Sequence, residues 1–361
     1  MKTRLTILFL LFFVILATAQ ESVKIQSIEV TGNKITDNEI ILREITFNNG
    51  DLFTRDELIN KIKESTENLN NLKLFNFVEI RQNKGNMNIA VVEKWYFWPY
   101  PVFEISERNF NTWWNEFKRN NYSDFTRINY GISLSLKNFR GKNELLQLKI
   151  RRGFKEHYLF SYQVPYFNKK KTIGLNTTFQ LFRRKKTFFK TYNNQLQYYE
   201  LNDKYTSKDY ELSMELLYRK NIDKKHKLMI SYYHSMVSDS IKIKNPNYLQ
   251  NNKNSGSYFK TSYQFFKEKR DYIMYPLNGH LLSTEISKYF KGTSPVNNFE
   301  FVSRAEKYIE LIKRIFIGSS FSTKWNSGKQ EVYFAQEGFG FNDYVRGYEY
   351  YVIDGEKFFL S

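Results

Sequence analysis

The feature that most constrains the fold is an alternation of apolar and polar residues along four long segments, residues 127–137, 144–151, 172–181 and 209–218. In the first, RINYGISLSLK, Ile128, Tyr130 and Ile132 share one face, and the residues between them are small or polar. Such a period-two pattern predicts strands. It continues for about the 9–11 residues that a tilted membrane strand needs, whereas strands of soluble proteins usually have about 5–6. We therefore expect an antiparallel transmembrane β-barrel with a polar lumen, because only a closed sheet satisfies every backbone group in lipid.

The aromatic content supports the same fold class. The chain holds 27 tyrosines and 33 phenylalanines, although its mean hydropathy is only −0.58. Membrane barrels combine these properties, since one face of each strand is polar and aromatic girdles mark the interfaces. The formal charge of +18 is interpreted as a bias of composition, so no nucleic-acid partner is expected. The absence of cysteine excludes disulfides, thiolate metal sites and cysteine nucleophiles.

Residues 1–19 have the features of a secretory signal peptide. Lys2 and Arg4 form a charged start, residues 5–16 form an apolar core, and Ala17-Thr18-Ala19 has the small-x-small pattern of a cleavage site. The apolar segment is too short to span a bilayer as a helix, and no later run of about 18 apolar residues occurs. The sequence therefore predicts an exported protein whose membrane spans are strands.

Residues 20–95 are predicted to form a small α+β domain in the order β-α-α-β-β. The segment 24–33 alternates and ends in a Gly-Asn turn. Thr36 with Glu39, and Thr54 with Glu57, have capping-box spacing and predict two helix starts. Residues 75–82 and 86–93 are predicted to form a hairpin around residues 83–85.

Residues 96–361 are assigned to the barrel. Short connections alternate with the longer polar segments 108–126, 183–207 and 238–256, as periplasmic turns and extracellular loops do in an up-and-down barrel. Eleven strands are expected, at 96–107, 126–137, 143–153, 157–165, 171–183, 207–219, 226–238, 256–270, 279–290, 297–309 and 314–325.

These features together resemble a known family. The β-α-α-β-β order, IEVTGN at 28–33 and LKLFNFVEI at 72–80 resemble a POTRA domain, the periplasmic module of the BamA/TamA-type outer-membrane insertase superfamily (the bacterial surface antigen family). Three segments of the barrel, NFRGKNE (138–144), VPYF (164–167) and KRDYIMYPLNGHLL (269–282), resemble turn signatures of that family, with Val164 in place of an acidic residue. The positions that carry this likeness are Asn138, Phe139, Gly141, Pro165, Tyr166, Phe167, Asp271, Pro276 and Gly279.

A fourth resemblance lies near the end of the sequence. Val345, Arg346, Gly347 and Tyr348 match the family's Val-Arg-Gly-Phe/Tyr motif, which implies a sixth extracellular loop that folds into the lumen and docks its arginine on inward-facing side chains. A guanidinium removed from water needs a carboxylate or several acceptors. Residues 356–361 would then begin a twelfth strand of a presumed sixteen, so an incomplete barrel is expected, one that does not insert stably alone.

Two prolines mark the first expected barrel strand. Pro99 and Pro101 are two residues apart, so both remove backbone donors from the same edge. The family resemblance implies a weak seam between the first and last strands that opens sideways, and these prolines would weaken it further. The other interpretation, that they only mark the linker from the small domain, is equally open.

The resemblance implies an outer-membrane assembly or translocation factor. Its POTRA-like domain, in the periplasm, would receive unfolded outer-membrane protein clients by β-augmentation, and the barrel seam would insert them into the outer-membrane lipid; an accessory periplasmic or lipoprotein partner is left open. The alternative is a two-partner-secretion pore that exports one dedicated substrate. No catalytic motif, metal site or cofactor site is evident: His157, His226, His234 and His280 are scattered. We therefore expect no enzyme activity and no cofactor.

Overall fold

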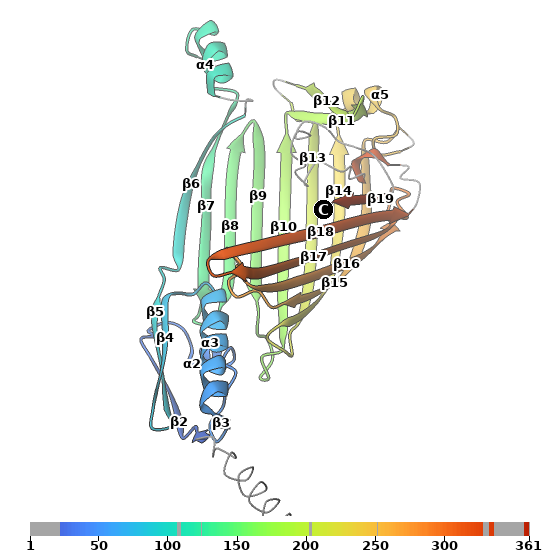
Figure 1. Cartoon of the computed structure of the whole chain (residues 1–361). Coiled ribbons are helices and arrows are strands. Elements are labelled where there is room, and N and C mark those ends of the chain that lie inside the picture. Colours follow the sequence, from blue (N-terminus) through green and yellow to red (C-terminus); the bar gives the residue numbers. More distant parts are fainter. Residues whose placement is uncertain are drawn as a thin grey trace, which may run out of the picture. The chain divides into compact units, whose positions relative to one another are not determined.

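The computed structural model describes residues 22–106, 110–123, 125–201, 204–250, 252–327, 332–335 and 357–360. The chain divides into two compact units, with the boundary between Lys94 and Trp95. Figure 1 shows the elements of each unit. The segment predicted to be a signal peptide lies outside the described residues. Among these residues, no helix has both the length and the apolar character needed to cross a bilayer.

The first unit has a three-stranded sheet in the order β2-β5-β4. Strand β2 (Ser27–Thr31) is parallel to β5 (Asn86–Glu93), and β4 (Phe75–Asn83) is antiparallel to it. A separate short pair joins β1 (Ser22–Lys24) to β3 (Leu52–Thr54), so the single strand expected at 24–33 is divided in two. With helices α2 (Asn38–Leu42) and α3 (Arg55–Asn71), the predicted β-α-α-β-β order is confirmed.

One of the two predicted helix caps is correct. The Thr54 side chain accepts the Glu57 N–H and the Glu57 side chain accepts the Thr54 N–H, which is the expected capping box of α3. The capping box predicted from Thr36 and Glu39 is wrong: Asp37 precedes α2 and makes no capping bond with its side chain. Thr36 donates from its N–H and hydroxyl to Glu93, at the end of β5, so it makes a tertiary contact that the local pattern did not predict.

The hairpin and the core of this unit follow from sequence. Lys84 and Gly85, at the β4–β5 turn, have φ values of 47° and 87°, as a two-residue type I′ turn requires. Leu58 and Leu69 of α3 are buried, while Ile62 and Leu72 on the same helix are partly buried. The core is apolar and includes Ile25, Ile40, Ile41, Phe47, Leu58, Leu69, Leu74, Met87, Ile89 and Val91.

The second unit is built on a twelve-stranded antiparallel sheet whose strands follow the chain, with β11 and β12 left out of the order. All eleven expected strands are present. They are β6 (Phe97–Ile105), β7 (Ile128–Phe139), β8 (Glu144–Gly153), β9 (Lys155–Val164), β10 (Ile173–Arg184), β13 (Ser207–Tyr218), β14 (Lys224–Val237), β15 (Ser255–Glu268), β16 (Gly279–Lys291), β17 (Phe299–Ile312) and β18 (Ile315–Ser327). The twelfth, β19 (Lys357–Leu360), pairs with β18.

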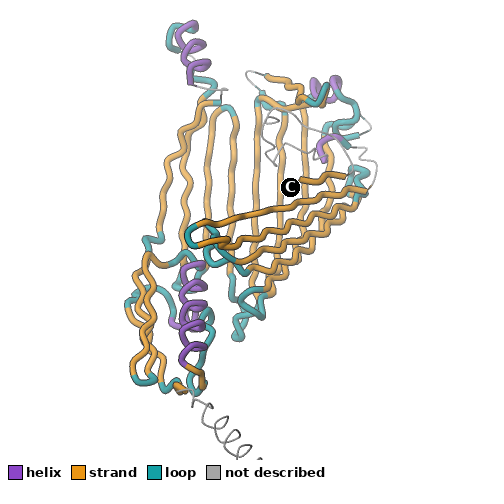
Figure 2. Tube along the Cα trace, viewed as in Figure 1, coloured by secondary structure: helices purple, strands orange, loops and turns teal. Residues whose placement is uncertain are grey.

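The sheet is strongly curved, and β15–β18 turn across in front of the earlier strands (Figures 1 and 2). Its outer face is apolar, as the alternation predicts. One row of paired residues runs across nine strands of this face: Pro99, Leu134, Leu148, Phe160, Phe179, Leu212, Tyr232, Phe259 and Phe290. The opposite face is polar: Ser231, Ser262 and Ser287 are fully buried there. A sheet with these two faces suits lipid outside and a polar lumen inside.

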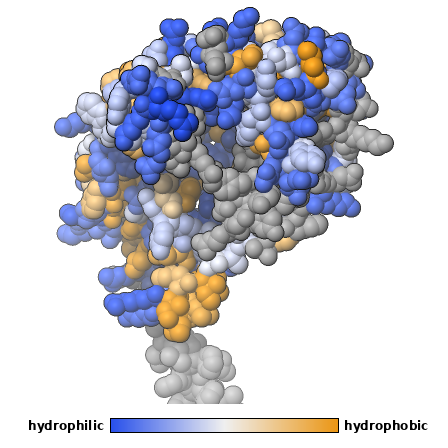
Figure 3. Space-filling view, turned by 90° about the horizontal axis from the view of Figure 1, so that it is seen from above, coloured by the Kyte–Doolittle hydropathy of each residue, from blue (hydrophilic) through white to orange (hydrophobic). Residues whose placement is uncertain are grey.

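The long connections contain more structure than a polar loop. Helix α4 (Phe110–Arg119) lies between β6 and β7, and α5 (Asp239–Lys244) lies between β14 and β15. Strands β11 (Lys186–Tyr192) and β12 (Gln195–Glu200) form their own hairpin, and a short helix, η1 (Tyr333–Ala335), follows β18. From the loop end the visible described surface is mostly hydrophilic (Figure 3). The expectation of polar connections overlooked their aromatic residues: Trp113 and Phe117 of α4 are buried with Ile128.

Candidate functional site

The POTRA-like unit presents an exposed strand edge. In the sheet order β2-β5-β4, both β2 and β4 have one edge that pairs with no strand of the described part of the unit. Strand β4 has nine residues and β2 has five. Phe77 of β4 and its cross-strand neighbour Val92 are both more than half exposed. An edge of this length with exposed apolar side chains can accept an added strand from another chain, because its backbone groups are free to pair.

The two prolines of β6 lie opposite Leu134 and Ile132 of β7. Just outside the two ends of β6, the Lys137 N–H donates to the Tyr96 carbonyl over 2.8 Å, and the Ser106 N–H donates to the Arg127 carbonyl over 2.7 Å. The register is unbroken between these bonds. Because backbone groups alternate in direction along a strand, even-numbered residues of β6 bond to β7 and odd-numbered residues point to the other edge.

Pro99 and Pro101 are both odd-numbered, so the donors they lack belong to the outer edge of β6. No strand among the described residues pairs with that edge. The β6–β7 ladder therefore loses no hydrogen bond to either proline, whereas any strand added at the outer edge would find acceptors and no donor at these two positions.

The turn between β7 and β8 is shaped by its asparagine. Asn138 has φ 51°, and its Oδ1 accepts the N–H of Asn143 over 2.8 Å, while its carbonyl accepts the N–H of Gly141. Arg140, in the same turn, makes two bonds to the Glu144 carboxylate, of 2.9 and 2.7 Å, and a third to the Tyr162 hydroxyl. The bonds that Arg140 donates to the Glu144 carboxylate raise the pKa of its guanidinium above its ordinary value. The Phe139 ring lies 6.3 Å from that of Tyr162, so this turn is fastened to β9.

The turn between β9 and β10 carries the second motif. The Phe167 N–H donates to the Ile173 carbonyl over 2.6 Å, which closes the turn, and the Phe167 side chain is exposed. The Tyr166 hydroxyl accepts a bond of 3.3 Å from Arg219, beyond the end of β13. A Cβ added at Gly174 would lie 2.7 Å from the Pro165 carbonyl oxygen, so the chain can pass Pro165 closely only because residue 174 is glycine.

The third motif forms the turn between β15 and β16. The Asp271 Oδ1 accepts the N–H groups of Tyr272, Leu277 and Asn278 over 2.9–3.2 Å, on both sides of Pro276. Gly279 has φ 108°, and a Cβ there would lie 2.0 Å from the Lys269 carbonyl oxygen. Asp271 thus holds the backbone of the turn by hydrogen bonds, and Gly279 allows the chain to pass close to Lys269.

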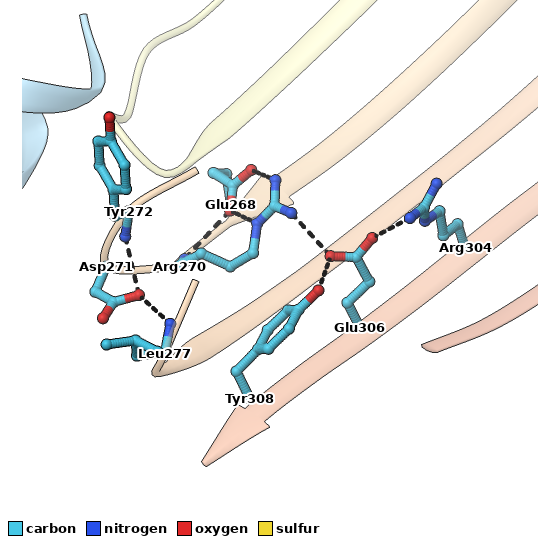
Figure 4. A network of polar contacts seen from close by, with 8 residues as sticks. All are labelled: Glu268, Arg270, Asp271, Tyr272, Leu277, Arg304, Glu306 and Tyr308. Carbon is cyan, nitrogen blue, oxygen red and sulfur yellow. Dashed lines mark hydrogen bonds and ion pairs between the residues drawn. The ribbon is translucent and has the colours of Figure 1, made fainter. Parts of the chain in front are cut away.

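Next to this turn lies a network of ionic groups on the lumen face (Figure 4). Arg270 makes a two-pronged contact with Glu268 over 2.7 and 2.6 Å and bonds Glu306 over 2.8 Å. Glu306, whose side chain is only 2% exposed, also accepts bonds from Arg304 and from the Tyr308 hydroxyl. The contact with Glu268 is the main cause that raises the pKa of Arg270 further above its ordinary range. The network fastens the β15–β16 turn to β17.

Sequence reasoning missed this network. Alternation assigns Glu268, Arg304 and Glu306 to the polar face, but it does not give the register that brings residues 36 apart into contact. Val345, Arg346, Gly347 and Tyr348 lie outside the described residues, so the lumen-docking arginine stays a prediction. The structure brings no pair of the three turn motifs into one site: each shapes its own turn.

Comparison with known protein families identifies the family to which the chain belongs. The family described as "Omp85 superfamily domain" matches residues 138–357, which is more than half of the sequence. The chain belongs to the Omp85 superfamily. In this Omp85 protein a second family, the POTRA family described as "Surface antigen variable number repeat", matches residues 23–94. The resemblance to the BamA/TamA-type superfamily is therefore confirmed, as is the arrangement of a POTRA unit followed by barrel strands.

Solved structures that match this chain include BamA from Haemophilus ducreyi lacking POTRA domains 1–3, with 14% identity and a TM-score of 0.49. They also include CdiB from Acinetobacter baumannii, with 12% identity and a TM-score of 0.41. CdiB from Escherichia coli matches with 10% identity and a TM-score of 0.43. The alignments cover 89%, 84% and 84% of this chain and 59%, 52% and 54% of those chains, respectively. The Omp85 protein thus spans little more than half the length of these structures. No curated protein matches its sequence.

Proposed function

We propose that this Omp85 protein assembles other proteins into the bacterial outer membrane, with its POTRA unit in the periplasm. Unfolded outer-membrane proteins are the proposed clients, and the membrane lipid is the medium that receives them. Client folding is itself downhill, so the proposed reaction needs no nucleotide, metal or catalytic side chain, and the protein is proposed not to be an enzyme.

The POTRA unit would supply the first contact with a client. Its nine-residue β4 edge offers unpaired backbone groups, and Phe77 offers an apolar side chain beside them. Because the chain has no cysteine, one introduced at the exposed Arg81 would be a unique attachment point for a cross-linker. We expect it to capture an unfolded client, whereas a cysteine at Lys63, which is exposed on helix α3 and belongs to no strand, should not.

The observation that carries the proposal is the outer edge of β6. Two adjacent outward-directed positions lack donors, so a strand paired there is held by fewer hydrogen bonds than at an ordinary edge. Each hydrogen bond contributes a net ~0.5–1.5 kcal/mol. Two missing bonds therefore weaken the seam by ~1–3 kcal/mol, or about one to two powers of ten in its opening equilibrium. Such a seam can exchange its closing strand for a client strand.

Restoring the donors tests this role. The double variant Pro99→Thr/Pro101→Thr should close the seam more tightly and slow the insertion of an unfolded barrel client into liposomes, measured by the heat-modifiable gel mobility of the client. Val102→Thr is the matched control, since residue 102 bonds toward β7 and adds no donor to the edge. Unchanged insertion by a correctly folded double variant would rule out the seam role.

The alternative is a two-partner-secretion pore that exports one dedicated substrate through the lumen. The two proposals differ in what reaches the far side of the membrane. An assembly factor leaves folded barrels of unrelated sequence in the bilayer, whereas a pore releases one substrate and leaves barrel clients unfolded. Supplying both kinds of client to the same liposomes separates the two outcomes.

A further inference from the structure

The outer face of the sheet carries two clusters of similar composition, one at each end of the strands. The register sets Leu146 opposite Tyr162, Leu148 opposite Phe160 and Ile150 opposite Tyr158, so even-numbered residues of β8 and β9 face outward. The turn-end cluster consists of Arg140, Glu144 and Tyr162. The loop-end cluster consists of Arg152, Glu156, Tyr158, Arg183, Tyr205 and Lys208.

The turn-end cluster is balanced in charge. One arginine faces one carboxylate, and the two bonds of 2.9 and 2.7 Å between them use both Glu144 oxygens. The Tyr162 hydroxyl donates to the same carboxylate over 2.9 Å. With its charge and its bonding capacity met, this cluster has no need of an external ion.

The loop-end cluster is not balanced. Around the nearly buried Glu156, Arg183 lies 3.5 Å away and Arg152 lies 3.9 Å away, both longer than a direct charged hydrogen bond. Lys208 is paired with Arg183 across β10 and β13, on the same face. Among the described residues, Arg152 and Arg183 contact no carboxylate other than Glu156, and Lys208 forms no ion pair. Counted over the described residues of this cluster, an excess of two positive charges therefore remains on the outer face.

Aromatic rings contact two of these cations, Arg183 and Lys208. The Arg183 guanidinium lies 5.9 Å from the Tyr158 ring centroid and 5.8 Å from that of Tyr205, and Lys208 lies 5.9 Å from the latter. Cation–π contacts of this kind position a charge without neutralising it. The Arg152 side chain is 63% exposed and that of Arg183 is 37% exposed, so both can reach a ligand.

We propose that the loop-end cluster binds the phosphorylated head group of a lipid in the outer leaflet. Guanidinium groups match phosphate oxygens in geometry, and three neighbouring cations that share one carboxylate among them complement a multiply charged anion. The apolar row that contains Leu148, Phe160 and Phe179 begins on the same strands and would contact the acyl chains. The inference rests on the membrane orientation in the proposed function, and it is independent of client assembly.

The test measures binding of fluorescent diphosphoryl lipid A to the full chain in detergent micelles. Each basic residue near a charged lipid surface contributes roughly fivefold to binding, so Arg152→Gln/Lys208→Gln should weaken it about 25-fold. Arg140→Gln, in the turn-end cluster, is the matched control and should change binding less than about twofold, since its charge is already met. Lys208→Arg should retain the wild-type affinity because it keeps the cation.

Several outcomes would overturn the proposal. Equal loss in the double variant and in Arg140→Gln would show a general charge effect, and unchanged binding in the double variant would remove the site. If inorganic phosphate displaces the lipid at millimolar concentration, the cluster is a site for the free anion instead. If the double variant fails to fold, the single variant Lys208→Gln tests the proposal instead. This variant should fold, because Lys208 forms no ion pair among the described residues. It should lower the affinity for the lipid about fivefold. These readouts remain valid even if client insertion is never observed.

Discussion

Glu93 is expected to be the strongest single polar contributor to the stability of the POTRA unit. Its carboxylate accepts the N–H groups of Lys34, Ile35 and Thr36 over 2.7–3.2 Å and the Thr36 hydroxyl over 2.5 Å. Residues 34–36 lie between β2 and α2, so one side chain at the end of β5 holds the connection between them.

The cost of Glu93→Gln follows from these contacts. A hydrogen bond to a charged acceptor contributes roughly twice as much as one to a neutral acceptor, so each donor loses about 1 kcal/mol when the carboxylate becomes an amide. Thr36 is only 2% exposed, so each of its two hydrogen bonds should be weakened by the full amount of about 1 kcal/mol. The N–H groups of Lys34 and Ile35 are on exposed residues and can bond water in the variant, so they should lose less. We therefore expect a loss of about 2–3 kcal/mol in the free energy of unfolding.

Urea denaturation of the POTRA unit, followed by circular dichroism, measures this loss directly. The matched control is Glu79→Gln on the neighbouring strand, whose partner Arg81 is largely exposed; it should cost less than about 0.5 kcal/mol. If the two variants lose the same stability, the Glu93 contacts do not have the weight assigned to them here.

Three further predictions concern other parts of the chain. Glu306→Gln should lower the urea stability of the strand unit by about 1–3 kcal/mol. The control Arg304→Gln, which changes an exposed partner of Glu306, should lower it by less than about 0.5 kcal/mol. Equal losses would contradict a central role for Glu306 in the network. Gly279→Ala should lower the urea stability of the strand unit in detergent, because a Cβ there would overlap the Lys269 carbonyl oxygen. Hydrogen bonds from the N-cap residue hold the pKa of Glu57 below its ordinary value of 4.5. The stabilisation is therefore complete above that pH and is lost as the pH falls through the lowered pKa. Glu57→Gln should remove this part of the acid dependence in circular dichroism.

Local sequence determined most of the fold. The strands of the second unit were predictable because their period-two alternation over membrane-strand length lies in consecutive residues, as in 127–137, and all eleven expected there are present. The α3 capping box and the turn at residues 83–85 were predictable for the same reason, since each involves residues only a few positions apart. The short pair β1–β3 was not, because its strands are joined only across the fold.

The contents of the long connections were predicted least well. Their polar composition hid helix α4, whose Trp113 and Phe117 are buried beside the end of β7. Strands β11 and β12 were missed because their alternation is interrupted by a register shift between Phe188 and Lys190. Composition averaged over a loop cannot show which of its aromatic side chains find a partner.

Sequence alone therefore determined the kind of protein: a POTRA unit followed by long two-faced strands, each encoded by its own local periodicity. Only the tertiary structure decided which groups act together. The register directs the missing donors of Pro99 and Pro101 to the outer edge of β6 and joins Arg270 to Glu306. It also places Arg152 and Arg183 near one carboxylate and sets Lys208 beside Arg183. The reason is physical: alternation fixes the face of a residue, but the pairing of strands fixes its neighbours.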